Sequence, residues 1–195
     1  MYEHFFKRLI DIILSALGLI LLSWLYLILA IAIVIDDPGP VFFSQKRIGI
    51  HKTHFQLHKF RSMKMNAADI RNSDGSTYNS DTDDRQTKVG KVLRKTSLDE
   101  LPQCINVLAG DMSFVGPRPS PMGNEATYTK FIKKKFRVRP GITGLNQALK
   151  RNSATMEERY KNDVYYAEHV SLLLDIKIIL MTVKSVLLRK NIYRK

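Results

Sequence analysis

The sequence has very little cysteine and no phosphate-binding loop of the P-loop type. Cys104 is the single cysteine among 195 residues, so no internal disulfide can form and nothing indicates an oxidising compartment. It stands among Leu101, Ile105 and Leu108, which predicts a small buried apolar residue rather than a nucleophile. No G-x-x-x-x-G-K-[ST] motif occurs, which excludes a P-loop nucleotidase.

Histidine is also sparse, and its spacing does not favour a metal site. His51, His54 and His58 fall in one predicted hairpin, but no cysteine or second histidine cluster completes a zinc set. The polar stretch 66–86 lacks the glycine and the closing glutamate of a calcium loop, so we expect a loop there and no calcium site.

A long run without charge or proline extends from Ile12 to Ile35. Roughly twenty apolar residues cross a bilayer as a helix, so this run predicts a membrane helix. Basic residues flank it on both sides, at Lys7 and Arg8 before the run and at Lys46 after it. Because positive residues prefer the cytoplasmic side, a re-entrant bend that leaves both flanks in the cytoplasm is favoured.

Acidic residues are few relative to basic ones. Lysine and arginine number 31 against 18 aspartates and glutamates, which gives a formal net charge of +13. Such an excess implies an anionic partner: nucleic acid, anionic lipid or a phosphorylated substrate. Charge alone does not choose among them, but no recognised nucleic-acid fold motif appears, so no nucleic-acid partner is expected.

Beyond residue 36 the sequence predicts an α+β fold, mostly helical with a small β-hairpin. The stretches "VFFSQ" (41–45) and "THFQLHKF" (53–60) are rich in β-branched and aromatic residues and are joined through Gly49. Helices are expected over 87–95, 96–108, 155–169 and 171–190. The last is amphipathic, which fits either a core-packing helix or an interfacial helix on a membrane surface.

Two adjacent acids, Asp99 and Glu100, stand between leucines in "TSLDELPQ". Ser97 with Glu100 matches the S-x-x-E capping box, and acids in a first helical turn are favoured by the helix dipole. Pro102 fits poorly inside a helix capped at Ser97, although it is harmless in the first turn of one capped at Asp99. On spacing alone, a structural role is favoured over a catalytic one.

Basic residues shift that weighting towards catalysis. Arg118 stands between Pro117 and Pro119, and a rigid arginine suits a bidentate hold on phosphate. Other basic residues lie in "HKFRSM", "LRK" and "LKRN": Lys59, Arg61, Arg94, Lys95, Lys150 and Arg151. A carboxylate pair among such groups suggests phosphoryl chemistry, with a metal ion offsetting phosphate charge. The "KKK" run, which includes Lys135, is expected to be a solvated charge run.

The ordered motifs "DPGPVFFSQKRIG", "HKFRSM", "KVGKVLRKTSLDELPQCINVLAGDMSFVGPRP", "VRPGITGL" and "NDVYYAEH" resemble the bacterial sugar transferase family, the monotopic phosphoglycosyl transferases. The resemblance covers nearly the whole chain, and the stretch 91–119 is very specific. It implies a catalytic domain, 37–195, on the cytoplasmic face of the bacterial inner membrane, anchored among membrane lipids by a re-entrant helix, 1–36. It also implies transfer of a sugar phosphate from a nucleotide sugar, commonly a UDP-sugar, to a polyprenol phosphate, with Mg²⁺, to begin a surface glycan.

The resemblance further implies roles for single residues. The aspartate of the L-D-E-L-P motif, here Asp99, is the nucleophile, forms a covalent aspartyl phosphosugar and meets the magnesium; Glu100 handles protons. The positions that match the phosphate-binding groups of the family are Lys59, Arg94, Arg118 and Arg151. Asp163 is expected to orient one of these arginines.

One position departs from the family's pattern. The Ser-Pro pair that often breaks the membrane helix is replaced by Ser23 and Trp24, so the predicted bend rests on Ser23, on Gly18 and on the charge argument. The sequence does not identify the sugar, the nucleotide, the polyprenol length or the oligomeric state. Two alternatives do not need Asp99: a membrane-tethered nucleic-acid-binding protein, and a non-catalytic membrane scaffold whose acid pair only caps a helix.

Overall fold

The N-terminal segment forms two helices separated by a bend. The computed structural model describes residues 1–70, 78, 80, 82–123 and 125–188. A π-helical turn, Tyr2–Phe6, leads into α1, Lys7–Leu21, which is followed by α2, Ser23–Asp36. Leu22 lies between them with φ −98° and ψ 7°, and the two helices are bent by 61°. The bend therefore lies next to Ser23, one of the two predicted helix breakers.

Within the described ranges, no single helix is both long and apolar enough to cross a membrane. Only α1 and α2 taken together, across their bend, satisfy that requirement, and they do so by length and composition alone.

The predicted hairpin is confirmed. Strands β1, Phe42–Ile48, and β2, His54–Phe60, pair antiparallel with Phe42 opposite Phe60. A 3₁₀ turn, Ile50–Lys52, connects them. The short β4, Ser120–Pro121, joins the far end of β1, where Ser120 faces Ile48. This pairing brings the segment after Arg118 to the edge of the hairpin.

A second, two-stranded sheet holds the other side of the Arg118 loop. Strand β3, Ser113–Val115, runs parallel to β5, Gly141–Thr143. The backbones approach so closely that a Cβ on Gly116 would lie 2.3 Å from the carbonyl oxygen of Arg139, and one on Gly144 would lie 2.1 Å from that of Gly116. Glycine is required at both positions because no side chain fits there.

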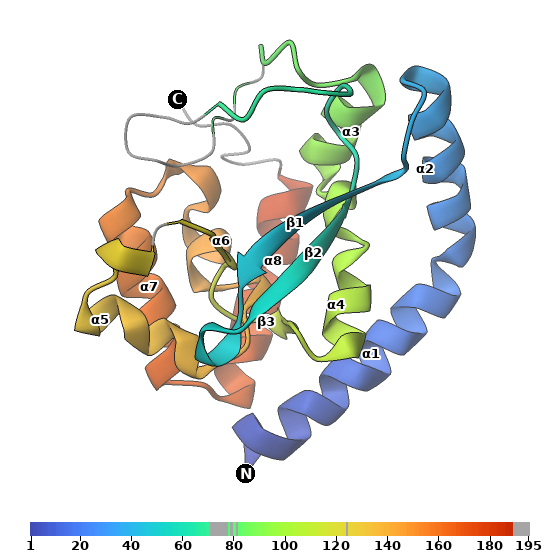
Figure 1. Cartoon of the computed structure of the whole chain (residues 1–195). Helices are drawn as coiled ribbons and strands as arrows, with labels where there is room; N and C mark the ends of the chain where they lie inside the picture. Colours follow the sequence, from blue (N-terminus) through green and yellow to red (C-terminus); the bar gives the residue numbers. More distant parts are fainter. Residues whose placement is uncertain (71–77, 79, 81, 124, 189–195) are drawn as a thin grey trace.

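Helices and 3₁₀ turns make up most of the remaining chain. The helices are α3 Lys88–Thr96, α4 Gln103–Ala109, α5 Lys130–Lys133, α6 Leu145–Leu149, α7 Met156–Glu168 and α8 Leu172–Leu187. The 3₁₀ turns are Leu98–Glu100, Glu125–Thr127, Lys134–Arg137 and Arg151–Ser153. Figure 1 shows the bent pair α1–α2 along one flank, α3 and α4 beside it, and α5 to α7 on the other side of the hairpin. The α+β fold class is confirmed.

The hydrophobic core is divided among several clusters around the two sheets. One joins Phe55 and Leu57 of β2 to Val107 of α4. Another packs Tyr166 of α7 and Ile178 of α8 against Val115. Cys104 is buried, as predicted, with 8% of its surface exposed.

Both ends of the bent helix pair attach to the rest of the chain. At the start, Asp175 of α8 accepts hydrogen bonds from Tyr2 at 2.7 Å and from Lys7 at 2.6 Å. Farther along α1, the buried carboxylate of Asp11 accepts the amide of Phe114 at 3.0 Å, and Arg8 donates to carbonyls at the end of α4.

At the end of α2, two acids bind the elements that lead to the acid pair. Asp36 accepts the amide of Val89, in the first turn of α3, at 2.7 Å. Asp37 pairs with the buried guanidinium of Arg61, which follows β2. The N-terminal helices therefore hold α3 and the end of β2 directly.

Candidate active site

The acid pair lies on a short turn between two helices, and the single helix expected over 96–108 is not formed. Ser97 ends α3 in the left-handed conformation, with φ 60°, and the 3₁₀ turn Leu98–Glu100 follows. α4 begins only after Pro102, so the proline is tolerated outside the helix interior. The capping-box reading is wrong: among the described residues, Ser97 and Glu100 bind other elements instead.

Glu100 is the centre of a group of cations. Lys59, near the end of β2, donates to Glu100 at 2.6 Å and lies 3.8 Å from the carboxylate of Asp99. The guanidinium of Arg118 lies 3.6 Å from Glu100. The structure thus brings together both predicted acids and two of the predicted phosphate-binding residues, from segments far apart in the sequence.

Arg94 and Arg151 frame the same turn from either side. Arg94, in the last turn of α3, donates to the hydroxyl of Ser62 at 3.0 Å, and its charge acts on Asp99. Arg151 donates to the hydroxyl of Ser97 at 2.8 Å. Both Ser97 and Arg151 have positive φ, 60° and 48°. Such strained non-glycine backbones concentrate at functional sites.

The two carboxylates have opposite pKa shifts. Burial raises the pKa of Asp99, and the negative charge of Glu100 adds to this, against the opposing effect of Lys59. Burial also disfavours ionised Glu100, but the charges of Lys59, Arg118 and Arg151 and the Lys59 hydrogen bond outweigh it and lower that pKa to about 2. Lys59, Arg94 and Arg118 lower the pKa of Asp99 and so favour its ionised form, but burial and the charge of Glu100 outweigh them. Two neighbouring acids with diverging pKa values suit different roles.

Among the described residues, Asp163 pairs directly with a lysine and not with an arginine. Its carboxylate forms a buried ion pair with Lys135 at 2.6 Å, and both side chains are 5% exposed. The reading of Lys135 as a solvated charge is therefore wrong as well. The neighbouring Lys134 of the same "KKK" run fits that reading better, since it pairs with Glu168 at the surface.

A cleft of about 910 Å³ contains these groups. Its lining includes Lys59, Arg94, Asp99, Glu100, Arg118, Arg151 and Asp163, together with Tyr78, Arg85, Tyr160 and Ile142. The volume is in the range of small-molecule sites. The structure therefore places all the predicted site residues around one cleft.

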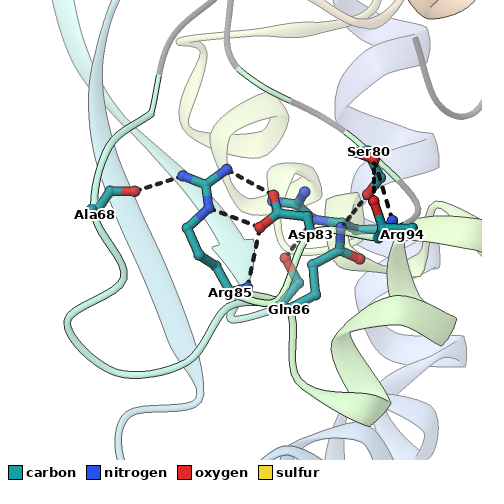
Figure 2. Close-up of polar contacts among 8 residues, drawn as sticks. Ala68, Ser80, Asp83, Arg85, Gln86 and Arg94 are labelled. Atoms are coloured by element: carbon teal, nitrogen blue, oxygen red, sulfur yellow. Dashed lines mark hydrogen bonds and ion pairs between the residues drawn. The ribbon is translucent and has the colours of Figure 1, made fainter. Parts of the chain in front are cut away.

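Part of the rim of this cleft comes from the polar loop that precedes α3. Figure 2 shows Arg85 between two partners: it donates to the carboxylate of Asp83 at 2.7 and 2.8 Å and to the carbonyl of Ala68 at 2.6 Å. Gln86 donates to the carbonyl of Ser80 at 2.9 Å. Much of the rest of this loop, 71–77, 79 and 81, lies outside the described residues.

A metal would have to share its coordination with substrate. In the described part of the chain, no group of three or more histidine, cysteine, aspartate or glutamate side chains could hold a metal. Magnesium is commonly bound by one or two carboxylates plus substrate phosphates. Asp99 fits such a site. Its carboxylate is buried, and the ammonium of Lys59 lies 3.8 Å away, which is beyond hydrogen-bond distance.

Three residues of this site were not found from the sequence. Ser62 and Ser97 orient arginines, and Lys135 pairs with Asp163. Ser62 and Ser97 lie within the matched motifs, but Ser62 was given no role and Ser97 only a capping role, and Lys135 is one residue in a run of three lysines. The positions of their partners, as many as 54 residues away, show only in the fold.

Residues 2–189 match the bacterial sugar transferase family, and the chain belongs to that family. It is 41% identical to an uncharacterized sugar transferase, EpsL, of Bacillus subtilis (strain 168), over 95% of this chain and 89% of that protein. A UDP-glucose:undecaprenyl-phosphate glucose-1-phosphate transferase of Caulobacter vibrioides is 39% identical over 96% of this chain and 72% of its own length. One of the same name from Klebsiella pneumoniae is 43% identical over 96% of this chain, which spans only 41% of that protein.

Proposed function

We propose that this protein transfers a sugar 1-phosphate from a nucleotide sugar to a polyprenol phosphate through a covalent intermediate on Asp99. The observation that carries the proposal is a buried carboxylate beside a second, ionised one, in a cleft lined by Lys59, Arg94, Arg118 and Arg151. Relatives that are named UDP-glucose:undecaprenyl-phosphate glucose-1-phosphate transferases support a UDP-sugar donor and undecaprenyl phosphate as acceptor.

In the first proposed step, a carboxylate oxygen of Asp99 forms a bond to the phosphorus that carries the sugar. The bond from that phosphorus to the bridging oxygen of the diphosphate breaks, and its electron pair leaves with the nucleoside monophosphate. Lys59, Arg94, Arg118 and Arg151 offset the charge that would repel a carboxylate from a diphosphate.

In the second step, an oxygen of the lipid phosphate attacks the same phosphorus and releases the Asp99 carboxylate. Glu100, the neighbouring acid, is the group that we assign to proton handling at the lipid phosphate. Bound magnesium would supply positive charge beside the phosphates. Asp99 would hold it, and that charge would favour the ionised carboxylate.

The acceptor is a lipid, and the surface of the molecule favours a membrane location. Outward-facing apolar side chains on α1 and α2 include Leu14, Leu17, Ile20, Leu21, Trp24, Leu27, Ile28 and Ile31. On α8 they include Leu173, Leu180, Val183 and Leu187. Soluble proteins rarely expose so much contiguous apolar surface. We propose that these helices enter or lie on the cytoplasmic face of the bacterial inner membrane.

The contacts of the bent pair favour a re-entrant arrangement. Tyr2 and Lys7 bind Asp175, and Asp37 at the other end binds Arg61. Both ends of the pair are therefore held by one domain, as expected of a segment that enters and leaves the bilayer on the same side.

Intact-protein mass spectrometry tests the covalent step. The purified membrane protein is incubated briefly with UDP-glucose or other nucleotide sugars, with Mg²⁺ and without lipid acceptor, and the mass of one sugar phosphate is expected on Asp99. The control is Asp99→Asn, which keeps the size of the side chain but removes the nucleophile. Normal turnover by this variant would end the proposed role of Asp99. A parent protein without adduct or turnover would favour the scaffold, whereas salt-dependent binding of generic DNA would favour the nucleic-acid alternative.

A further inference from the structure

The buried lysine of the "KKK" run has a local arrangement that needs an explanation. The ammonium of Lys135 pairs with Asp163 at 2.6 Å, and it lies 5.7 Å from the ring centre of Phe136 and 5.5 Å from that of Tyr160. Burying an ion pair costs free energy, and well-packed apolar residues often stabilise a fold as well or better. A buried pair at the edge of a reactive cleft therefore suggests a task besides stability.

The same lysine reaches the backbone of the Arg118 loop. Lys135 Nζ donates to the carbonyl oxygen of Arg118 at 3.4 Å. Three more hydrogen bonds fix the preceding residues: Tyr166 Oη to Val115 O at 3.0 Å, Gly116 N to Thr143 O at 2.9 Å, and Gly141 N to Pro117 O at 2.9 Å. Consecutive backbone groups from Val115 to Arg118 are therefore tied to β5, to α7 and to Lys135.

Two of these ties originate on one face of α7. Asp163 and Tyr166 are three residues apart, so their side chains point the same way from the helix. Tyr166 holds Val115 directly, and Asp163 holds Arg118 through Lys135. By contrast, the Arg118 side chain itself is 51% exposed and lies 3.6 Å from Glu100. Its direction into the cleft depends on how its backbone is held.

We propose that Lys135, fixed by Asp163, is a positioning residue that sets the direction of Arg118 towards the phosphates. This rests on the proposed function, in which Arg118 binds phosphate. Lys135→Met keeps the length of the side chain and removes the charge. It should reduce kcat/KM for the nucleotide sugar by roughly tenfold to a hundredfold, the scale expected when a group near the chemistry is misplaced by about 1 Å.

A double-mutant cycle with Arg118→Ala separates positioning from direct contact. If Lys135 acts through Arg118, adding Lys135→Met to Arg118→Ala causes no further loss. A second loss of the same size would show that Lys135 acts on substrate independently, and would overturn the proposal. An unchanged kcat/KM in Lys135→Met alone would also overturn it. The matched control is Lys134→Met, the exposed neighbour paired with Glu168, which should leave kcat/KM unchanged.

Lys135→Met leaves Asp163 buried without its partner, which can unfold the protein. The variant Lys135→Met with Asp163→Leu removes both charges. Its kcat/KM should fall as much as that of Lys135→Met, and adding Arg118→Ala to this variant should again cause no loss beyond that of Arg118→Ala alone.

Backbone hydrogen exchange of the 114–119 segment gives a readout that needs no activity: exchange should be faster in either variant and unchanged in Lys134→Met. Unaltered exchange would overturn the inference even in an active enzyme. An inactive parent with faster exchange in the variants would overturn only the proposed function.

Discussion

At Asp99, burial acts against the ionised carboxylate that the proposed chemistry requires. Its pKa is raised by burial, whereas that of Glu100 is lowered by Lys59 and the arginines. A raised acid pKa in the folded state means that ionised Asp99 destabilises the fold at neutral pH, and that this cost disappears as the pH falls through the raised pKa. The residue is therefore retained at the expense of stability, as expected of a functional group.

Asp99→Asn should accordingly be inactive and more stable. The amide keeps the shape of the side chain without a buried charge, so the thermal midpoint should rise at pH 7, with a smaller gain at acidic pH, where the parent carboxyl is protonated. Differential scanning fluorimetry of both proteins at several pH values measures this. A lower midpoint for the variant at pH 7 would show that the carboxylate stabilises the fold, as a helix cap does.

Glu100→Gln should move the pH dependence of the first step. The charge of Glu100 raises the pKa of Asp99 and competes for Lys59, which is 2.6 Å from Glu100 and 3.8 Å from Asp99. Without that charge the pKa of Asp99 falls, so the acidic limb of nucleoside monophosphate release, in a single turnover without lipid acceptor, should shift to lower pH. If the acidic limbs of the parent and of Glu100→Gln coincide, this result would argue against Asp99 as the titrating nucleophile.

At the scale of elements, α3 and the end of β2 hold the site by close backbone packing. A Cβ on Gly90 would lie 2.0 Å from the carbonyl oxygen of Ser62, the residue whose hydroxyl binds Arg94. This oxygen belongs to the backbone and cannot move aside as a flexible side chain could, so any larger residue at position 90 must push α3 away from the segment that follows β2. This single glycine lets the helix that carries Arg94 reach the cleft.

Gly90→Ala should therefore destabilise the protein by roughly 1–3 kcal/mol, as overpacking does in other proteins, and should lower activity by displacing Arg94. Chemical denaturation and nucleoside monophosphate release measure the two effects. The control is Gly18→Ala, where an added Cβ meets nothing within 4 Å in helix α1. That change should be neutral or stabilising by up to about 1 kcal/mol. Equal effects of the two substitutions would contradict the close-packing argument.

The elements show which parts of the fold follow from local sequence. The hairpin and the helices at 88–96, 156–168 and 172–187 were predictable because alternation, helical periodicity and Pro-Gly turns are local signals. The break between Ser97 and Gln103 was not, because the S-x-x-E pattern indicates a cap and only the fold shows that Glu100 binds Lys59 instead. In the site, the family motif identified the acids and the arginines. The ion pair of Lys135 with Asp163 was not predictable in this way, because it joins residues that are 28 positions apart in the chain.

For the whole molecule, the N-terminal helices form part of the structure that supports the site. Asp36 binds the first turn of α3, Asp37 binds Arg61, and Asp11 binds the amide of Phe114. The bonds from Asp36 and Asp11 link residues 1–36 to α3 and β3, and Asp37, directly after α2, binds the segment that follows β2. The expected division into 1–36 and 37–195 stays a prediction, but the contacts indicate that the two parts act as one unit.

The re-entrant arrangement predicts that both ends of the bent pair lie on the cytoplasmic side. Single cysteines at Glu3 and Lys130, both exposed in the structure, would be introduced into a Cys104→Ala background and expressed in bacterial cells. A membrane-impermeant maleimide should label both in inside-out vesicles and neither in intact, outer-membrane-permeabilised cells.

A third cysteine at Ser23, which follows the bend and is exposed on the protein, should be protected by lipid in both preparations and become reactive in detergent. Labelling of Glu3→Cys and Lys130→Cys from opposite sides would establish a true span. Such a span would require the bonds from Tyr2 and Lys7 to Asp175 to be broken in the membrane.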